Sequence, residues 1–185
     1  FSGPAVAAAL SAEAAGLPLV VPLAQQSGLD SLGNYTFQLR PTPEAQGRAR
    51  GEYATLGLGL KTLVVLAPLT DYGWNFEREF TRVAQTNGGR VVYRDWYLPD
   101  QQKDFRREFA EIRRVGLALK PALPDSLVMA DSSGMAATGD QEVIDTIDGI
   151  AVVVESFEDA KIIAPQLHFH QVRAQLLGND IWYDP

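Results

Sequence analysis

Apolar residues gather in short blocks along this chain, and the clearest block lies within residues 60–80. Thr62 to Leu66 is a continuous apolar run, short enough for a strand that is buried on both faces. Turn-forming residues follow the run and place Asp71 and Tyr72 on a loop. Four apolar residues then recur at the spacing of an amphipathic helix, namely Phe76, Phe80, Val83 and Ala84. This stretch therefore predicts a strand, a loop and a helix, in that order.

The rest of the chain continues the alternation of strands and helices. Helices are predicted over residues 5–15, from Pro43 to about Leu56, after Asp104 as the N-cap, and from about Phe157 to Leu167. Further strands are predicted over residues 17–21, 35–39, 90–97, 126–130, 150–154 and 175–177. Because strands and helices alternate, we predict an α/β fold with mostly parallel sheets.

Length and composition narrow the class of protein. The chain has 185 residues, of which 46% are hydrophobic and 21% charged, enough for a packed core and unlike a disordered chain. Acidic and basic residues are interspersed and the net charge is −7, which argues against a nucleic-acid-binding surface. No cysteine is present, so disulfides and thiol chemistry are excluded. The start at Phe1, without an initiator methionine, predicts a processed or excised piece of a longer protein.

Three motifs that carry chemistry in other proteins are weak in this sequence. His168 and His170 have a spacing that suits zinc on a strand, but no cysteine and no nearby acid complete a ligand set. The glycines of residues 57–59 precede a strand, whereas those of a phosphate-binding loop follow one. Ser133 lies on a small-residue loop without the G-x-S-x-G elbow of hydrolases. We therefore predict no metal, no cofactor and no catalytic residue, and keep a flavodoxin-like hydrolase using His168 or Ser133 as the enzyme alternative.

Aromatic and acidic side chains follow three of the predicted strands. Tyr72 comes after the strand at 62–66, Phe157 after the strand at 150–154, and Asp180 and Trp182 after the strand at 175–177. The carboxyl ends of parallel strands share one rim, where open α/β sheets bind their ligands. Aromatic residues with a few polar groups on such a rim suit a small-molecule cleft. The alternative is that these aromatic residues simply cap the core.

Five segments of the chain together resemble type I periplasmic binding proteins of the leucine/isoleucine/valine-binding type. The segments are, in order, GLPLVVPLAQQSGL, FQLRPTPEAQGRARGEYA, LKTLVVLAPLTDYGWNFEREF, GGRVVYRDWYLPDQQKDFRREFAEIR and FEDAKIIAPQLHFHQVRAQLLGNDIWYDP. They span nearly the whole chain except residues 117–148. No single segment is exclusive to the family, but five of them in the right order and spacing are fairly specific.

The resemblance implies a fold and a function. Such proteins have two Rossmann-like, three-layer lobes that close on a ligand, and they are substrate-binding components of ABC transporters. Residues 1–40 would be the end of the first lobe and residues 43–185 most of the second, so the chain is expected to be a fragment. A non-enzymatic protein, periplasmic or extracellular, is expected to act with the membrane subunits of a transporter. A lipid anchor on the full-length protein and a homodimer are left open.

The resemblance and the rim together predict a set of ligand-binding residues: Ser2, Gly3, Ala24, Gln25, Tyr72, Phe157, Asp180 and Trp182. Asp180 falls where amino-acid binders carry an acid that pairs with the ammonium group of the ligand, a strong charge-assisted contact. Gln25 departs from the small hydroxyl residue that the family often has, and Phe157 also departs from the family pattern. From the position of Asp180 we expect the ligand to be an amino acid, and from the two departures we extend this to similar small molecules.

A second family competes with the first. Penicillin-binding-protein activators are lipoproteins of the same fold that bind a protein partner, and the irregular segment before Asp148 and the stretch KIIAPQL also resemble them. The geometry between the lobes distinguishes the two families. An open, polar, aromatic-lined cleft favours a small solute, whereas a groove filled by the protein's own side chains favours the activator.

Overall fold

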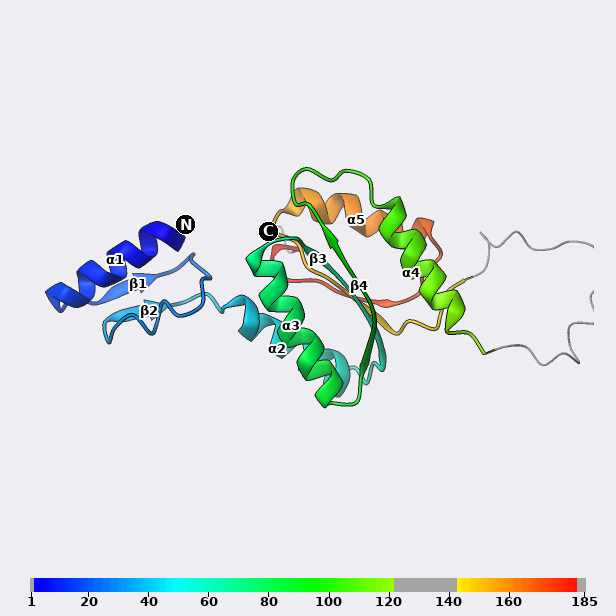
Figure 1. Ribbon diagram of the computed structural model, residues 1–185, viewed down its shortest axis with the longest axis horizontal. Helices are drawn as coiled ribbons and strands as arrows, with labels where there is room; N and C mark the ends of the chain where they lie inside the picture. Colours follow the sequence, from blue (N-terminus) through cyan, green and yellow to red (C-terminus); the bar gives the residue numbers. More distant parts are fainter. Residues whose placement is uncertain (1, 122–142, 183–185) are drawn as a thin grey trace, which may run out of the picture.

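The computed structural model describes residues 2–121 and 143–182 of the chain (Figure 1). The strand predicted over residues 126–130 and the alternative nucleophile Ser133 lie outside the described residues, as do the side chains of Ser2 and His168. Within the described ranges, helices and strands alternate from residue 43 onward, and every paired strand is parallel to its neighbour. The predicted α/β class with parallel sheets is therefore confirmed.

The first group of elements is small and precedes residue 40. It consists of helix α1 (Ser2–Ala15) and the parallel strands β1 (Leu19–Val21) and β2 (Thr36–Gln38). Gly16 ends α1 with a φ of 64°, a conformation that glycine adopts without steric cost. Val21, Ala24 and Leu29 form the buried centre of this group, against which α1 packs. Val20 and Phe37, on the opposite face of the two strands, remain more than half exposed.

The second group is built on a four-stranded parallel sheet in the order β4-β3-β5-β6. Its strands are β3 (Thr62–Pro68), β4 (Arg90–Tyr97), β5 (Gly149–Val152) and β6 (Gln175–Leu177). The five residues from Leu63 to Ala67 have no exposed surface, because β3 is flanked by strands on both edges and by helices on both faces. This is the position that its unbroken apolar run predicts.

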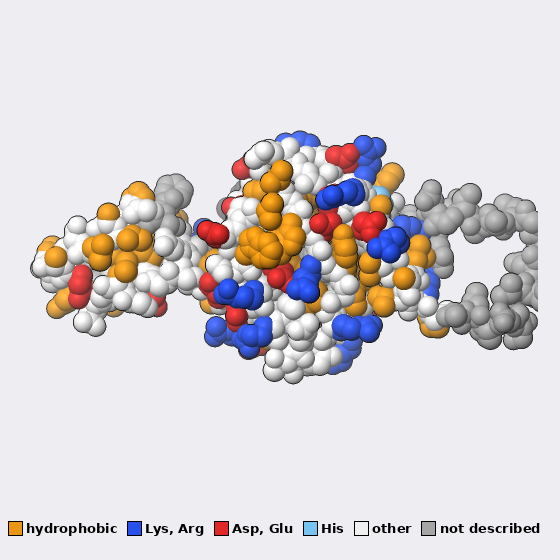
Figure 2. Space-filling view, in the orientation of Figure 1, with side chains coloured by type: hydrophobic (Ala, Val, Ile, Leu, Met, Phe, Trp, Pro, Cys, Tyr) orange, Lys and Arg blue, Asp and Glu red, His pale blue; other side chains and the backbone are white. Residues whose placement is uncertain are grey.

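Helices cover both faces of this sheet and complete three layers (Figure 1). On one face, Phe76 and Phe80 of α3 (Asp71–Thr86) pack against Leu63, Val65 and Ala67. On the other face, α4 (Arg106–Ala118) and α5 (Phe157–Phe169) pack against Val64 and Leu66. The outer surface carries acidic and basic side chains interspersed with apolar ones on the face that Figure 2 shows. No helix in the described part of the chain is long and apolar enough to cross a membrane.

Helix α2 (Pro43–Glu52) lies against α3 at unusually close range. The contact is made by Gly47 and Gly51, one helical turn apart on the same face of α2. A Cβ at Gly47 would overlap the carbonyl oxygen of Phe76, and one at Gly51 would lie 2.9 Å from that of Phe80. Both glycines, which in the sequence only weaken the predicted helix, are therefore required for packing.

The start of α3 differs from its prediction. The prediction that Asp71 and Tyr72 lie on a loop is wrong, because α3 begins at Asp71 and both residues lie in its first turn. Thr70 is the N-cap, and its hydroxyl oxygen accepts a hydrogen bond from Gly73 N at 3.2 Å. Glycine is required at position 73 because a Cβ there would overlap the carbonyl oxygen of Pro68. The chain does not turn at this residue.

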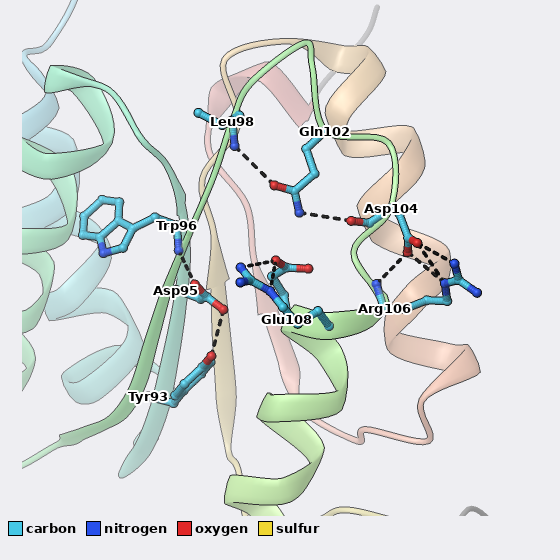
Figure 3. Close-up of polar contacts among 9 residues, drawn as sticks. Tyr93, Asp95, Trp96, Leu98, Gln102, Asp104, Arg106 and Glu108 are labelled. Atoms are coloured by element: carbon cyan, nitrogen blue, oxygen red, sulfur yellow. Dashed lines mark hydrogen bonds and ion pairs between the residues drawn. The ribbon is translucent and has the colours of Figure 1, made fainter.

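Several other element ends also differ from their predictions, among them the following three. The α-helix predicted to Leu56 ends at Glu52 and continues as a π-turn, η1 (Tyr53–Gly57), in which Leu58 N donates to Tyr53 O at 2.9 Å. Strand β5 ends at Val152, although the buried apolar run continues to residue 154. The N-cap of α4 is Phe105; the neighbouring Asp104 accepts a hydrogen bond from the backbone N–H of Arg106 and binds its guanidinium (Figure 3).

Candidate functional site

A cleft of about 760 Å³ lies between the two groups of elements. The first group contributes the loop of residues 23–27, and Arg40 and Pro43 lie where the chain passes from one group to the other. The second group contributes residues that follow strands of its sheet, namely Asp71, Tyr72 and Asn75 after β3, Glu155 after β5 and Ile181 after β6. The cleft therefore lies at the carboxyl rim of the sheet, where parallel α/β sheets bind ligands.

Tyr72 is held in the wall of the cleft by two hydrogen bonds. Its hydroxyl donates to Gln46 Oε1 at 2.9 Å and accepts from Asn179 Nδ2 at 3.3 Å. Burial, and to a lesser extent the charge of Asp180, raise the pKa of Tyr72 despite its hydrogen bond from Asn179. Tyr72 therefore remains neutral well above neutral pH, and its ring forms a fixed apolar surface.

Arg40 and Asp180 form an ion pair beside the cleft. Arg40 lies just before α2, whereas Asp180 begins the short 3-10 helix η2 (Asp180–Trp182) after β6. Both side chains are partly exposed, at 33% and 45%; Arg40 lines the cleft, and Asp180 adjoins it through Arg40. The pair sets opposite charges side by side, an arrangement that can also bind the two charges of a zwitterion.

Two further contacts shape the cleft. Ser27 Oγ donates to Glu44 Oε2 at 2.5 Å and so joins the 23–27 loop to the first turn of α2. Thr70, the N-cap of α3, donates its hydroxyl proton to Glu155. Gln25 contributes an amide nitrogen that is buried yet has no hydrogen-bond partner in the described structure. A buried donor without a partner is costly, so this amide is a natural contact for a ligand oxygen.

The structure brings together some of the predicted site residues and separates others. Ala24, Gln25 and Tyr72 line the cleft, and Asp180 adjoins it through Arg40. Gly3 lies in α1, and its surroundings are open. Phe157 packs on the core under Lys161, whose Nζ lies 4.6 Å from the ring centroid. Trp182 packs on the same core and donates from Nε1 to the carbonyl oxygen of Val152 at 3.1 Å. For these two aromatic residues, the alternative interpretation as caps of the core fits the contacts.

Several cleft residues were not predicted from the sequence. Glu155 directly follows a buried strand, so the rule that selected Phe157 two residues later could have selected it. Asn75 lies one helical turn beyond Tyr72. A predicted helix that begins at Asp71 would have placed Asn75 on the same side of the helix as Tyr72. Nothing in the sequence around Arg40 indicates a site residue, because its partner Asp180 is 140 residues away in the sequence.

The described residues give no support to a metal site. No group of three His, Asp or Glu side chains in residues 2–121 and 143–182 could hold a metal ion. The ring of His170 stacks on Phe109, with 5.8 Å between the ring centroids.

Comparison with known proteins identifies the class to which this fold and cleft belong. The model of the periplasmic binding protein family matches residues 1–167, so the chain belongs to that family. Comparison with curated proteins gives no match.

Solved structures of solute-binding proteins share the fold. A protein from Rhodospirillum rubrum assigned to branched-chain amino acid ABC transport superposes with a TM-score of 0.71 at 18% identity. The branched-chain amino acid transporter substrate-binding protein of Streptococcus pneumoniae, in complex with isoleucine, superposes with a TM-score of 0.64 at 20% sequence identity. A solute-binding protein of an ABC transporter from R. palustris, in complex with benzoate, superposes with a TM-score of 0.65 at 20% sequence identity. The alignments cover 97%, 97% and 99% of this chain but only 42% of each solved structure.

Proposed function

We propose that this chain is part of an extracytoplasmic solute-binding protein that captures a small ligand for an ABC transporter. In this proposal, residues 1–40 are the end of one lobe, residues 43–185 are most of the second, and the lobes close on the ligand. The membrane subunits of the transporter are the protein partner, and the protein binds its ligand without converting it. Family membership and the position of the cleft between the two groups of elements support this proposal.

The open cleft is the observation that carries the proposal. It is lined by the phenol of Tyr72, the amide of Gln25 and the guanidinium of Arg40, and no side chain among the described residues fills it. A polar, aromatic-lined cleft of this kind suits a small solute. It favours the solute-binding family over the activator family, in which the groove would be occupied.

An amino acid would match the charges beside the cleft. The guanidinium of Arg40 would bind the ligand carboxylate, for which its planar donors are well suited. Asp180 would bind the ligand ammonium, and the Arg40–Asp180 ion pair would be exchanged for two ion pairs with the ligand. The ring of Tyr72 would pack on the ligand, and the unpartnered amide of Gln25 would donate to it.

Calorimetry on the full-length protein with a panel of amino acids and with benzoate tests this assignment. Losing one member of a desolvated charge pair costs about 2–5 kcal/mol. Asp180→Ala should therefore weaken amino-acid binding by roughly 30-fold or more. It should not weaken any binding of benzoate, because benzoate has no ammonium group and Arg40 no longer has to leave its ion pair with Asp180 to bind the carboxylate. Arg40→Ala should weaken both kinds of ligand.

Glu158→Ala, which removes an exposed acid on α5, is the matched control and should leave the affinity unaltered. Unchanged amino-acid affinity in Asp180→Ala would rule out the assigned role of Asp180. If the wild-type protein binds no amino acid, the ligand belongs to another class of solute.

A further inference from the structure

The outward side of α2 and η1 carries apolar residues that nothing in the described structure covers. Ala45, Ala49, Tyr53 and Leu56 recur at helical spacing on this side, which we call the outer face. Tyr53 is 54% exposed and Leu56 is 69% exposed, so both present most of their side chains to solvent. Large apolar side chains in one exposed row are typical of a contact surface.

A groove runs along the same helix. It has a volume of about 250 Å³ and is lined by Pro41, Ala45, Gln46, Ala49 and Arg50, with Tyr53 at one end. Two of the lining residues are alanines, whose small side chains allow another helix to approach closely. The opposite side of α2 is fixed on α3 by Gly47 and Gly51, which makes the outer face a rigid surface.

The outer face is complementary to itself. If a second copy of α2 is laid antiparallel across it, Tyr53 of each copy enters the groove beside Ala45 and Ala49 of the other. In the same register, Leu56 of each copy reaches Pro41 of the other. A surface that offers both the projecting ring and the groove for it suits an isologous, two-fold contact. Buried tyrosines are also enriched among the residues that dominate such contacts.

The charges on one flank of the outer face agree with this arrangement. Arg48 and Glu52 are exposed and lie one helical turn apart on that flank. Neither residue has an ion pair within 4.0 Å in the described part of the chain, and the charge of Arg48 acts on Glu79 of α3 from farther away. In an antiparallel pair of helices, like flanks meet, so Arg48 of one copy faces Glu52 of the other, and the reverse pair forms as well. The register that places Tyr53 in the groove is the register that pairs these charges.

We propose that the outer face of α2 and η1 is the contact between two copies of this protein. A face one helix wide is smaller than a standard interface of about 1,200–2,000 Å². The two copies should therefore form a concentration-dependent dimer, not an obligate one. None of the residues that line the groove lines the cleft, so the contact goes beyond solute binding.

Charge-swap variants of the full-length protein test the contact by sedimentation equilibrium and native mass spectrometry. Arg48→Glu places four acids on the shared flank of a homodimer, and Glu52→Arg places four bases there. Each single variant should associate at least tenfold more weakly than the wild type. An equimolar mixture of the two should form a heterodimer, because each acid then faces a base, and the double variant should again dimerise as the wild type does.

The mixture separates the contact from any effect of the substitutions on the helix itself, because each variant carries the same helix alone and in the mixture. Tyr53→Ala should weaken the dimer in every charge background. Arg114→Glu, the same change of charge on exposed α4, is the control and should leave association unaltered. A wild-type protein that stays monomeric at its highest soluble concentration would overturn the proposal. So would a dimer that is indifferent to the charge swaps.

Discussion

Single side chains hold the rim of the second sheet together, and Asn179 is the clearest example. Its Nδ2 donates to the carbonyl oxygen of Val154 at 2.7 Å and to Tyr72 Oη at 3.3 Å, and its Oδ1 accepts from Val154 N at 3.3 Å. One buried amide therefore satisfies both backbone groups of Val154 where β5 has already ended. The strand predicted to Val154 stops at Val152, and beyond that end Val153 N donates to Leu66 O while Asn179 pairs with Val154.

Asn179→Ala should destabilise the protein without removing any group that lines the cleft. The substitution leaves the buried N–H and C=O of Val154 without partners, and an unsatisfied buried group costs about 1–3 kcal/mol. Urea unfolding followed by circular dichroism measures the change. Asn75→Ala, which alters a partly exposed amide in the cleft, is the control and should change the free energy of unfolding by less than about 0.5 kcal/mol. Equal stabilities of the two variants would contradict the role given to Asn179.

Whether a residue could be predicted depended on how far away its partner lies. Tyr72 could be selected because it directly follows a strong strand signal. Asn179 could not, because Gly178-Asn179-Asp180 has the composition of an ordinary turn and nothing local points to Val154. Arg40 was missed for the same reason, since its partner Asp180 is distant in the sequence.

At the scale of elements, β4 and β6 agree with their predictions to the residue, whereas the other described strands and helices α1, α2 and α5 differ from theirs at one end or both. The bounds of β4 and β6 agree with their predictions, because alternation and turn residues on both sides define them. The end of α2 does not agree, because Tyr53 and Leu56 continue the helical spacing while the backbone widens into a π-turn. Hydrophobic spacing reports which residues share a side, not which carbonyl accepts each hydrogen bond.

The packing of α2 on α3 gives a prediction for the element scale. Gly47→Ala forces a Cβ into the space of the Phe76 carbonyl, which belongs to the backbone of α3 and cannot turn away. Overpacking of this kind costs about 1–3 kcal/mol. Thermal unfolding followed by calorimetry should show a lower midpoint for this variant.

Gly3→Ala is the matched control, because Gly3 also lies in a helix but has no atom within 4 Å of the added Cβ. Alanine is the better helix former by about 1 kcal/mol, so this control should be neutral or slightly stabilising. If both alanine variants melted at the same temperature, the close contact between α2 and α3 would not exist.

At the scale of the whole molecule, the sequence predicted the layers but not the arrangement within them. Alternating strands and helices were sufficient to predict a parallel sheet, and the resemblance to the binding-protein family implied the three layers. The strand order β4-β3-β5-β6 was not predictable, because β3 pairs with β5 across more than 80 residues. On the side of the cleft formed by residues 23–27, Ala24 and Gln25 were predicted only from the family resemblance, because no local pattern shows that this loop faces the second group of elements.

Acid should weaken the contact between those two groups. Partial burial favours the protonated form of Glu44, but the hydrogen bond from Ser27, the helix backbone, Thr42 and Arg78 together hold its pKa below the usual 4.5. A lowered pKa stabilises the folded protein above pH 4.5, and the stabilisation is lost as the pH falls through the lower folded value. The melting temperature of the wild type should exceed that of Glu44→Gln at neutral pH, and the difference should shrink below pH 4.5.

Ser27→Ala should reproduce the effect of Glu44→Gln at neutral pH, because it removes the other half of the same hydrogen bond. A difference between wild type and Glu44→Gln that stays constant down to the acid limit of folding would show that the carboxylate charge plays no part.

The order of the strands also determines what happens while the chain is being made. Strand β3 has a partner as soon as β4 is complete at Tyr97, but its other edge waits for β5, which ends at Val152. Synthesis adds about 5–20 residues per second, so an apolar strand edge stays open for roughly 3–11 s. Open edges of this kind pair readily with other chains. A nascent chain of this protein therefore needs protection from aggregation during that interval, and a shorter segment between β4 and β5 would reduce the need.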